Sequence, residues 1–284
     1  MAIWKALLFP GVFGLLLAAE QVVPLRRRKS PLVRRLAVNL VMAACVFAVG
    51  SLAVRSVGLL GAGWIESSGF GLCSLLPLPS WLGIVVGFGL MDLTFYYWHR
   101  ANHVIPLLWR FHNVHHVDPD LDVSTSFRFH FVEIGYSTLF RIVQVVVLGV
   151  TPLTYVIYET VFAIGTMFHH ANVRLPYGLE RWLNKVFVTP RMHGVHHSAV
   201  RAETDSNYSV VFSWWDRLHR SLVLNVRQAD IRIGVPAYQR REDNKLRLLI
   251  TMPFVRQRAY WCNDDDTPAA GHQAEEVAAS QMLP

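Results

Sequence analysis

Histidine residues cluster in the middle of this chain, in short groups whose spacing suits metal binding. The sequence holds 13 histidines, and 12 of them lie between His99 and His219. Three groups stand out: His99-Arg-Ala-Asn-His103, His112-Asn-Val-His115-His116 and His193-Gly-Val-His196-His197. Ordinary core or surface histidines would be spread along the chain, so this clustering predicts a site built from imidazoles.

The spacing explains how a few helices could hold so many ligands. Residues four apart share one helix face, so His99 and His103 can reach one site. The adjacent His115 and His116 point about 100° apart on a helix, so one helix can serve two neighbouring metals. Eight imidazoles exceed the four ligands of structural zinc and the three of catalytic zinc. The pattern indicates two metals, although imidazole alone does not select among zinc, copper, iron and nickel.

Further histidines stand where apolar segments end. His130 lies just before one such segment, and His169 and His170 end another. We expect His130 and His170 to be additional ligands and His169 to be a neighbour. His219 and His272 are expected to lie outside the site.

The elements that must position these residues are apolar and long. About 20 apolar residues span a bilayer, and segments of that kind cover residues 6–25, 36–54 and 81–98. Two shorter segments, 134–150 and 152–168, predict a helical hairpin that turns at Thr151-Pro152. We interpret the glycine-rich stretch 57–79 as a loop or re-entrant piece. Arg141 and Glu159 lie at similar depth in the hairpin. We expect that they pair, or that the hairpin is only partly immersed, or that they extend separately to the surface.

The positive charge indicates a membrane flank. The net charge of +7 comes partly from Arg26-Arg27-Arg28-Lys29 with Arg34 and Arg35, between two apolar segments. This position favours cytoplasmic flanking of a membrane over nucleic-acid binding. It also favours an uncleaved first anchor over a signal peptide. The resulting multi-pass topology brings every histidine group to the cytoplasmic side. The three cysteines are far apart, so no disulfide framework or cysteine-ligated cluster is expected.

The motifs around the histidines resemble the fatty acid hydroxylase and sterol desaturase superfamily over about residues 80 to 220. The similar segments are Asp92-Leu-Thr-Phe-Tyr-Tyr-Trp-His-Arg, Arg128-Phe-His-Phe-Val-Glu133, His170-Ala-Asn-Val-Arg-Leu-Pro176, Thr189-Pro-Arg-Met-His-Gly-Val-His-His-Ser198, Glu203-Thr-Asp-Ser-Asn-Tyr208 and Trp214-Trp-Asp-Arg-Leu218. The branch it looks most like is bacterial and sterol-desaturase-like. Phe131 replaces a usual proline, and Leu218-His219-Arg220 replaces a more usual Leu-Phe-Gly.

The resemblance implies an all-α integral membrane bundle with a cytosolic histidine-rich helical cap, set in the bacterial inner membrane. It implies two iron ions, with O2 as co-substrate, and oxidation of a lipid C–H bond by hydroxylation or desaturation. Fatty acyl, sterol or hopanoid, carotenoid and aminolipid substrates all stay open. The implied ligands are His99, His103, His112, His115, His116, His130, His170, His193, His196 and His197. Residues expected to orient them are Asp92, Asp122, Glu133, Glu203, Asp205, Asn172 and Asn207.

We divide the chain into anchor helices at 1–80, a catalytic domain at 81–220 and a cytoplasmic tail at 221–284. Residues 246–255 could lie at the membrane interface, and the polar end from Asp264 is expected to be disordered. The chain has no GxGxxG fingerprint. We therefore expect an external electron donor, either a ferredoxin, a cytochrome or a reductase. A basic surface near Arg217, Arg220, Arg227 and Arg232 could receive it.

Two other functions are weighed against this one. A membrane zinc hydrolase would use the HxxxH frame, but Arg100 stands where its glutamate base would be. A non-enzymatic haem or metal-storage protein would need few of the histidines. Both leave most of the three groups unexplained.

Overall fold

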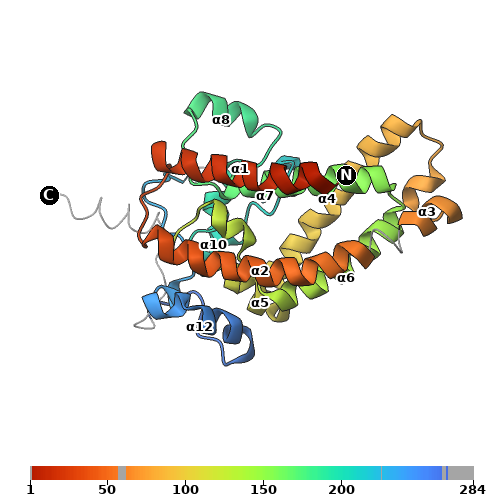
Figure 1. Cartoon of the computed structure of the whole chain (residues 1–284). Coiled ribbons are helices and arrows are strands. Elements are labelled where there is room, and N and C mark those ends of the chain that lie inside the picture. Colours follow the sequence, from red (N-terminus) through yellow and green to blue (C-terminus); the bar gives the residue numbers. More distant parts are fainter. Residues whose placement is uncertain (1, 57–61, 225, 264–266, 268–284) are drawn as a thin grey trace.

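The computed structural model describes residues 2–56, 62–224, 226–263 and 267, and these form an all-helical protein. Only three isolated β-bridges occur among the described residues. Five long helices run lengthwise through the molecule (Figure 1): α1 Ala2–Val22, α2 Leu32–Ser56, α4 Ser80–Val104, α6 Phe131–Leu148 and α7 Pro152–His170. The helical fold class expected from the sequence is confirmed.

Short helices and turns complete the chain. Near one end of the long helices lie α3 Ala62–Ser68 and the 3-10 turn η2 Leu72–Leu75. The remaining elements are α5 Pro106–His116, η3 Val123–Phe127, α8 Tyr177–Leu183, α9 Pro190–His196, α10 Arg201–Thr204, α11 Trp214–His219, η4 Pro236–Tyr238, η5 Arg241–Asn244, α12 Leu246–Thr251 and η6 Met252–Phe254. We call α5, η3 and residues 171–263 the cap.

Several of the long helices are apolar enough to cross a membrane. Among the described residues, three helical segments qualify: Leu32–Gly50, Ser80–Val104 and Phe131–Leu148. A shorter apolar helix covers Leu7–Val22. The expected segment 152–168 is a helix, α7, but it does not meet the same measure of length and hydropathy. The chain is therefore a helical membrane protein, with α7 packed against α1 and α4.

The predicted hairpin joins α6 and α7. Gly149 ends α6 with a positive φ of 64°, and a side chain there would collide with the backbone of Phe70 and Gly71. Thr151 caps α7, and Pro152 occupies its first turn. Because glycine alone adopts this conformation without strain, the turn fixes where the two helices meet the 69–75 loop.

The two charged residues inside the hairpin contact each other. Arg141 Nε lies 3.0 Å from Glu159 Oε1. The guanidinium also lies over the rings of Phe95, Tyr158 and Phe162. Pairing lowers the cost of placing charge at this depth, so the expectation of an Arg141–Glu159 pair is confirmed over separate extension to the surface.

Three further expectations concern residues 246–255, residues 57–79 and the end of the chain from Asp264 onward. Residues 246–255 form α12 and η6, whose Phe254 is 61% exposed. The stretch 57–79 contains α3 and η2, and its residues 57–61 lie outside the described part. The expectation of disorder from Asp264 onward, and the placement of His272, also concern residues outside it.

Candidate metal centre

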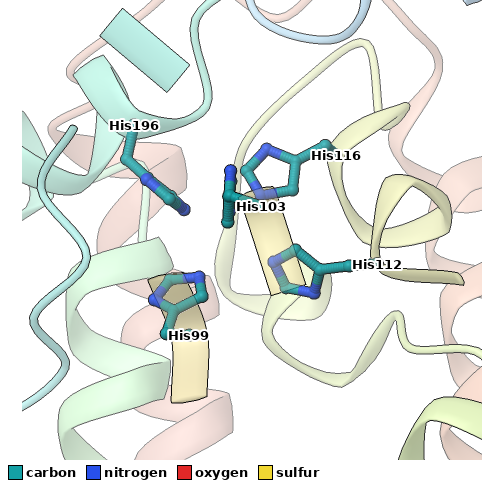
Figure 2. A group of neighbouring side chains, drawn as sticks. All are labelled: His99, His103, His112, His116 and His196. Carbon is teal, nitrogen blue, oxygen red and sulfur yellow. The ribbon is translucent and has the colours of Figure 1, made fainter. Parts of the chain in front are cut away.

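Five histidines from three helices form the first histidine group (Figure 2). They are His99 and His103 of α4, His112 and His116 of α5, and His196 of α9. Each ring offers a nitrogen, and these nitrogens all lie within 4.8 Å of one another. In Figure 2 the five rings surround a common centre.

Four more histidines form the second histidine group, which lies beside the first. They are His115 of α5, His170 at the end of α7, His193 of α9 and His197 directly after α9. Their Nε2 atoms converge: His170 lies 3.1 Å from both His115 and His193, and His193 lies 3.1 Å from His197. Four imidazole nitrogens at this spacing match the ligand count of a metal site.

Two short helices supply ligands to both groups, which is how the groups become neighbours. On α5, His112 and His116 face the first group while His115 faces the second. On α9, His196 faces the first group, and the second group takes His193 from α9 and His197 from just beyond it. The angle between successive helical residues explains the division. The rings of His116 and His197 stack across the boundary, with centroids 4.3 Å apart.

Three of the five rings in the first group have fixed partners at their outer nitrogen. His99 Nδ1 donates to the Tyr208 carbonyl at 2.8 Å, and His196 Nδ1 donates to the Ser206 carbonyl at 2.7 Å. His112 Nδ1 lies 2.7 Å from Glu133 Oε1. Such bonds fix the tautomer and leave Nε2 free to bind a metal.

The second group has fewer outer partners. His170 Nδ1 donates to the Thr166 carbonyl at 2.8 Å. The Nδ1 atoms of His115, His193 and His197 are buried, and no hydrogen-bond partner is found for them. The second group is therefore held mainly by packing, including a stack between His115 and Phe129 with ring centroids 4.3 Å apart.

Burial keeps the rings of both groups neutral. Burial lowers the pKa of His196 to about 3. Burial, followed by the charge of neighbouring histidines, lowers the pKa of His115, His116, His193 and His197 well below the usual range. Neutral imidazole is the form that binds metal.

Unpaired ring nitrogens show that these residues fit a metal. In the first group the Nε2 atoms of His112, His116 and His196 are buried and have no hydrogen-bond partner. A buried polar atom without a partner costs about 1–3 kcal/mol. Each of these atoms belongs to a set that converges on one point, so a bound metal would satisfy several of them together. The donor set, nitrogen only, suits Zn, Cu, Fe or Ni.

Of two other histidines, His130 lies differently from expectation and His169 lies beside the ligands, as expected. His130 belongs to neither group: its Nε2 donates to the Ile250 carbonyl, and its Nδ1 accepts the Val132 amide. His169, expected to be a neighbour, is 1% exposed and its ring centroid lies 4.0 Å from that of His193. Neither ring nitrogen of His169 has a hydrogen-bond partner. His169 directly precedes His170 on α7, so its ring lies beside the second group, to which His170 belongs.

The polar residues expected to orient the imidazoles divide into two kinds. Glu133 bonds His112, and Asp205 lies 3.8 Å from His103 Nδ1. Four others hold backbone groups or neighbouring side chains instead: Asp92 accepts from Phe212 and Trp215, Asp122 binds Arg35 and Ser124, Asn172 binds Arg26, and Asn207 binds Met192 and Val223. Sequence reasoning missed the Tyr208 and Ser206 carbonyls, because a backbone carbonyl leaves no residue-type signal.

Two residues of the basic run are buried in the cap, which the membrane-flank interpretation did not foresee. Arg35 Nε lies 2.8 Å from Asp118 and its Nη1 lies 2.6 Å from Asp122, just after the second histidine motif. Although burial acts to raise it, the charges of Arg35 and Arg128 hold the pKa of Asp118 well below its usual range. Arg26 donates to Gln228 at 2.6 Å beside Gly194, where any side chain would collide with its guanidinium.

These features agree with the comparisons to known proteins. The family model for fatty acid hydroxylases matches residues 84–221, the range that carries both histidine groups. Residues 84–221 are therefore similar to the fatty acid hydroxylase family, which supports the resemblance to the fatty acid hydroxylase and sterol desaturase superfamily. No solved structure matches it.

Several curated relatives are similar over the same part of the chain. Ornithine lipid hydroxylase OlsE of Rhizobium tropici is 32% identical over 161 residues, which are 55% of this chain and 46% of the relative. Alkylglycerol monooxygenase of Xenopus tropicalis is 27% identical over 47% of the chain and 29% of the relative. Human cholesterol 25-hydroxylase is 26% identical over 45% of the chain and 47% of the relative. The matches thus span about half, or less, of each relative's length.

Proposed function

We propose that this protein is a membrane oxygenase in which histidines hold two iron ions that use O2 to oxidise a C–H bond of a lipid. The observation that carries the proposal is the pairing of two buried histidine groups, of five and four residues, served by the same helices α5 and α9. The similarity to the fatty acid hydroxylase family and the names of the relatives support a lipid substrate.

The proposed ligands are the nine histidines of the two groups. The first iron would be held by the first histidine group and the second iron by the second histidine group. When bound, the iron pair supplies the oxygen activation that protein side chains cannot perform. His130 is left out of this set, because its ring nitrogens already bond Ile250 and Val132.

The chain's own residues position the ligands and exclude water. Glu133 and the carbonyls of Ser206 and Tyr208 hold three imidazoles with Nε2 inward. Tyr208 is 3% exposed, and its ring lies 5.3 Å from that of His103 and 6.0 Å from that of His99. Burial of this kind protects a reactive centre from solvent. The same machinery serves hydroxylation and desaturation, since both begin with removal of a hydrogen atom.

The proposed setting is a multi-pass bacterial inner-membrane protein whose histidines face the cytoplasm. His99, His103 and His170 lie at the ends of α4 and α7, so the ligands stand at the edge of the apolar base. Arg27, Arg28, Lys29 and Arg34 flank the start of α2 and would favour the cytoplasmic side. A lipid could then present a chain to the centre from the bilayer, and electrons would come from a separate donor. We place the catalytic domain at 81–220, between anchor helices and a tail.

A zinc hydrolase fits the arrangement less well. Arg100, which stands at the position of the glutamate base in an HExxH site, is exposed and lies outside both groups. A single catalytic zinc would use three protein ligands, leaving six of the nine clustered histidines without a role.

Lipid profiling tests the proposal. A bacterial host that expresses the wild-type chain should accumulate lipids that are 16 Da heavier or 2 Da lighter than their precursors, as hydroxylation or desaturation requires. The matched host that expresses His196→Ala at the same level should not. Growth under 18O2 should label a hydroxylated product. Identical lipid profiles in both hosts across fatty acyl, sterol, hopanoid, carotenoid and amino lipids would count against the function.

A further inference from the structure

An unbroken series of aromatic contacts leads from the surface of the cap to the first histidine group. Trp109 of α5 is 6% exposed, and its ring centroid lies 4.9 Å from that of His103 and 5.2 Å from that of His116. On its other side Trp109 stacks on Trp261, with centroids 5.9 Å apart and planes 22° apart. Tyr260 contacts Trp109 at the same centroid distance.

The geometry of α5 explains why Trp109 reaches the ligands. Trp109, His112 and His116 are related by steps of three and four residues, so they share one face of the helix. The indole therefore lies directly beside imidazoles that the proposed iron would use. Tyr260 and Trp261 are only partly buried and pack on the core that Trp109 joins.

A basic pocket opens beside the outer end of this aromatic series. Its lining includes Arg240, Arg256, Gln257, Arg258 and Asn263, and Trp261 belongs to the same segment of the chain. Residues 240–258 contain six basic side chains and two acidic ones, Glu242 and Asp243. Asp243 is buried and pairs with Arg258 at 2.7 Å, so the charged side chains among the described residues that line the pocket are all arginines.

We propose that this pocket and its rim are the docking surface for an acidic one-electron carrier protein, and that Trp261 and Trp109 conduct its electrons to the first histidine group. This inference rests on the proposed function. Inserting one oxygen atom of O2 into a C–H bond and reducing the other to water consumes two electrons and two protons beyond the substrate. Two reduced carrier molecules supply these electrons in successive single-electron steps, and each is oxidised once.

A protein partner fits this surface better than a lipid headgroup because the two observations coincide. A positive patch attracts an acidic protein and speeds its association. The same patch stands where stacked indoles connect the surface to the ligands, and electron tunnelling falls steeply with distance. A headgroup would need the charge but would have no use for the aromatic contacts.

Anaerobic rapid mixing tests the docking surface. The iron-loaded full-length protein, oxidised and in nanodiscs, is mixed with a reduced acidic [2Fe–2S] ferredoxin, whose oxidation is followed by its visible absorbance. Arg240→Glu with Arg256→Glu should slow the second-order reaction at low salt by about tenfold or more, and added salt should shrink the difference. Arg220→Glu, on the other basic surface, is the matched control and should react like wild type.

Variants at Trp261 test whether this residue conducts electrons or only packs against Trp109. At saturating ferredoxin, Trp261→Leu and Trp261→Phe should both lose electron-transfer rate, whereas the ferredoxin concentration for half-maximal rate should not change. Electrons would tunnel through the contact between Trp261 and Trp109, and phenylalanine is too small to keep that contact. A Trp261→Phe variant that behaves like wild type would therefore overturn the conduction role. All variants should be reduced normally by dithionite with a small mediator.

Three other outcomes would overturn the proposal. A double arginine variant that oxidises ferredoxin as fast as wild type, while losing co-purified anionic lipid, would assign the pocket to headgroups and overturn the proposal. A larger effect from Arg220→Glu would move docking to the other surface and overturn it as well. A wild-type protein that neither ferredoxin nor the mediator reduces would contradict the proposed function, and this inference with it.

Discussion

The two histidine groups share helices α5 and α9 but differ in how their rings are held. In the first group His99, His112 and His196 each bond an outer partner through Nδ1, namely Tyr208, Glu133 and Ser206. In the second group, among the residues that the structure describes, only His170 has such a bond, to Thr166, and the other three Nδ1 atoms find no partner there. The first group is therefore organised in advance, and the second relies on packing.

The clustered histidines and the groups that hydrogen-bond their outer nitrogens therefore come from different parts of the chain. The inner ligands follow from local helical spacing. The outer partners come from remote segments: Tyr208 and Ser206 lie in the loop after α10, and Glu133 lies on α6. Since outer partners typically change metal affinity by about 10–100-fold, we expect the first group to retain its metal more tightly. The two groups should therefore respond differently when a ligand or an outer partner is removed.

Removing an inner ligand should have the largest effect. His196→Ala should empty the first group, abolish lipid oxidation and leave membrane insertion intact, because the ring is one of five that converge there. His130→Ala is the matched control, since its ring bonds Ile250 outside both groups. Metal analysis of both purified variants checks this. Loss of metal from His130→Ala would return that residue to the ligand set.

Breaking the Arg35 pair should destabilise the support of both groups together. Arg35→Met leaves Asp118 and Asp122 buried without their main cation, and removing one partner of a buried pair costs about 3–5 kcal/mol. We expect a lower unfolding temperature in detergent and weaker metal retention at both groups. Arg34→Met, at its partly buried neighbour, is the control. Loss of metal from one group alone would show that the pairs of Arg35 with Asp118 and Asp122 do not support both groups.

Removing one outer hydrogen-bond partner should lower the metal affinity of the first group alone. Glu133→Gln replaces the carboxylate that bonds His112 with a neutral amide, so affinity at the first group should fall by about 10–100-fold. Competition with a chelator, read as two phases of metal release, measures both groups in one experiment. Asp230→Asn, which loses an exposed pair with Arg227 outside the centre, is the control. An equal loss at the second group would contradict the contrast.

Relieving backbone strain should give the smallest effect. Arg220 has a left-handed backbone with φ 58° at the end of α11, where non-glycine residues pay about 1–2 kcal/mol. Arg220→Gly restores the glycine usual in the family and should raise stability by about 1 kcal/mol. A thermal unfolding series checks the sign. Destabilisation would mean that the arginine side chain contributes more than its backbone costs.

The helices and most of the candidate site could be predicted from the sequence. Long apolar runs and the i, i+3, i+4 spacing of His112, His115 and His116 are local signals, and the structure brings nine of the ten expected ligands together. The similar depth of Arg141 and Glu159 in a hairpin made their pairing one of the alternatives, and the structure selects it.

The rest depended on contacts that local patterns do not encode. His130 looked like a ligand because it stands at a helix start, yet it caps α6 and bonds Ile250, which is 120 residues away. Arg35 looked like a membrane flank because its neighbours are basic, yet it pairs with Asp118 across 83 residues. Trp109 and Trp261 carried no motif, so their stacking became visible only in the fold.

Metal identity and stoichiometry test the central claim most directly. The wild-type chain, expressed with ample iron and purified in detergent, should contain roughly two irons per molecule, with the Mössbauer signature of a coupled pair. His196→Ala should contain fewer, and the coupling should be lost. One zinc and no iron under the same conditions would contradict the account and direct the search to hydrolase substrates.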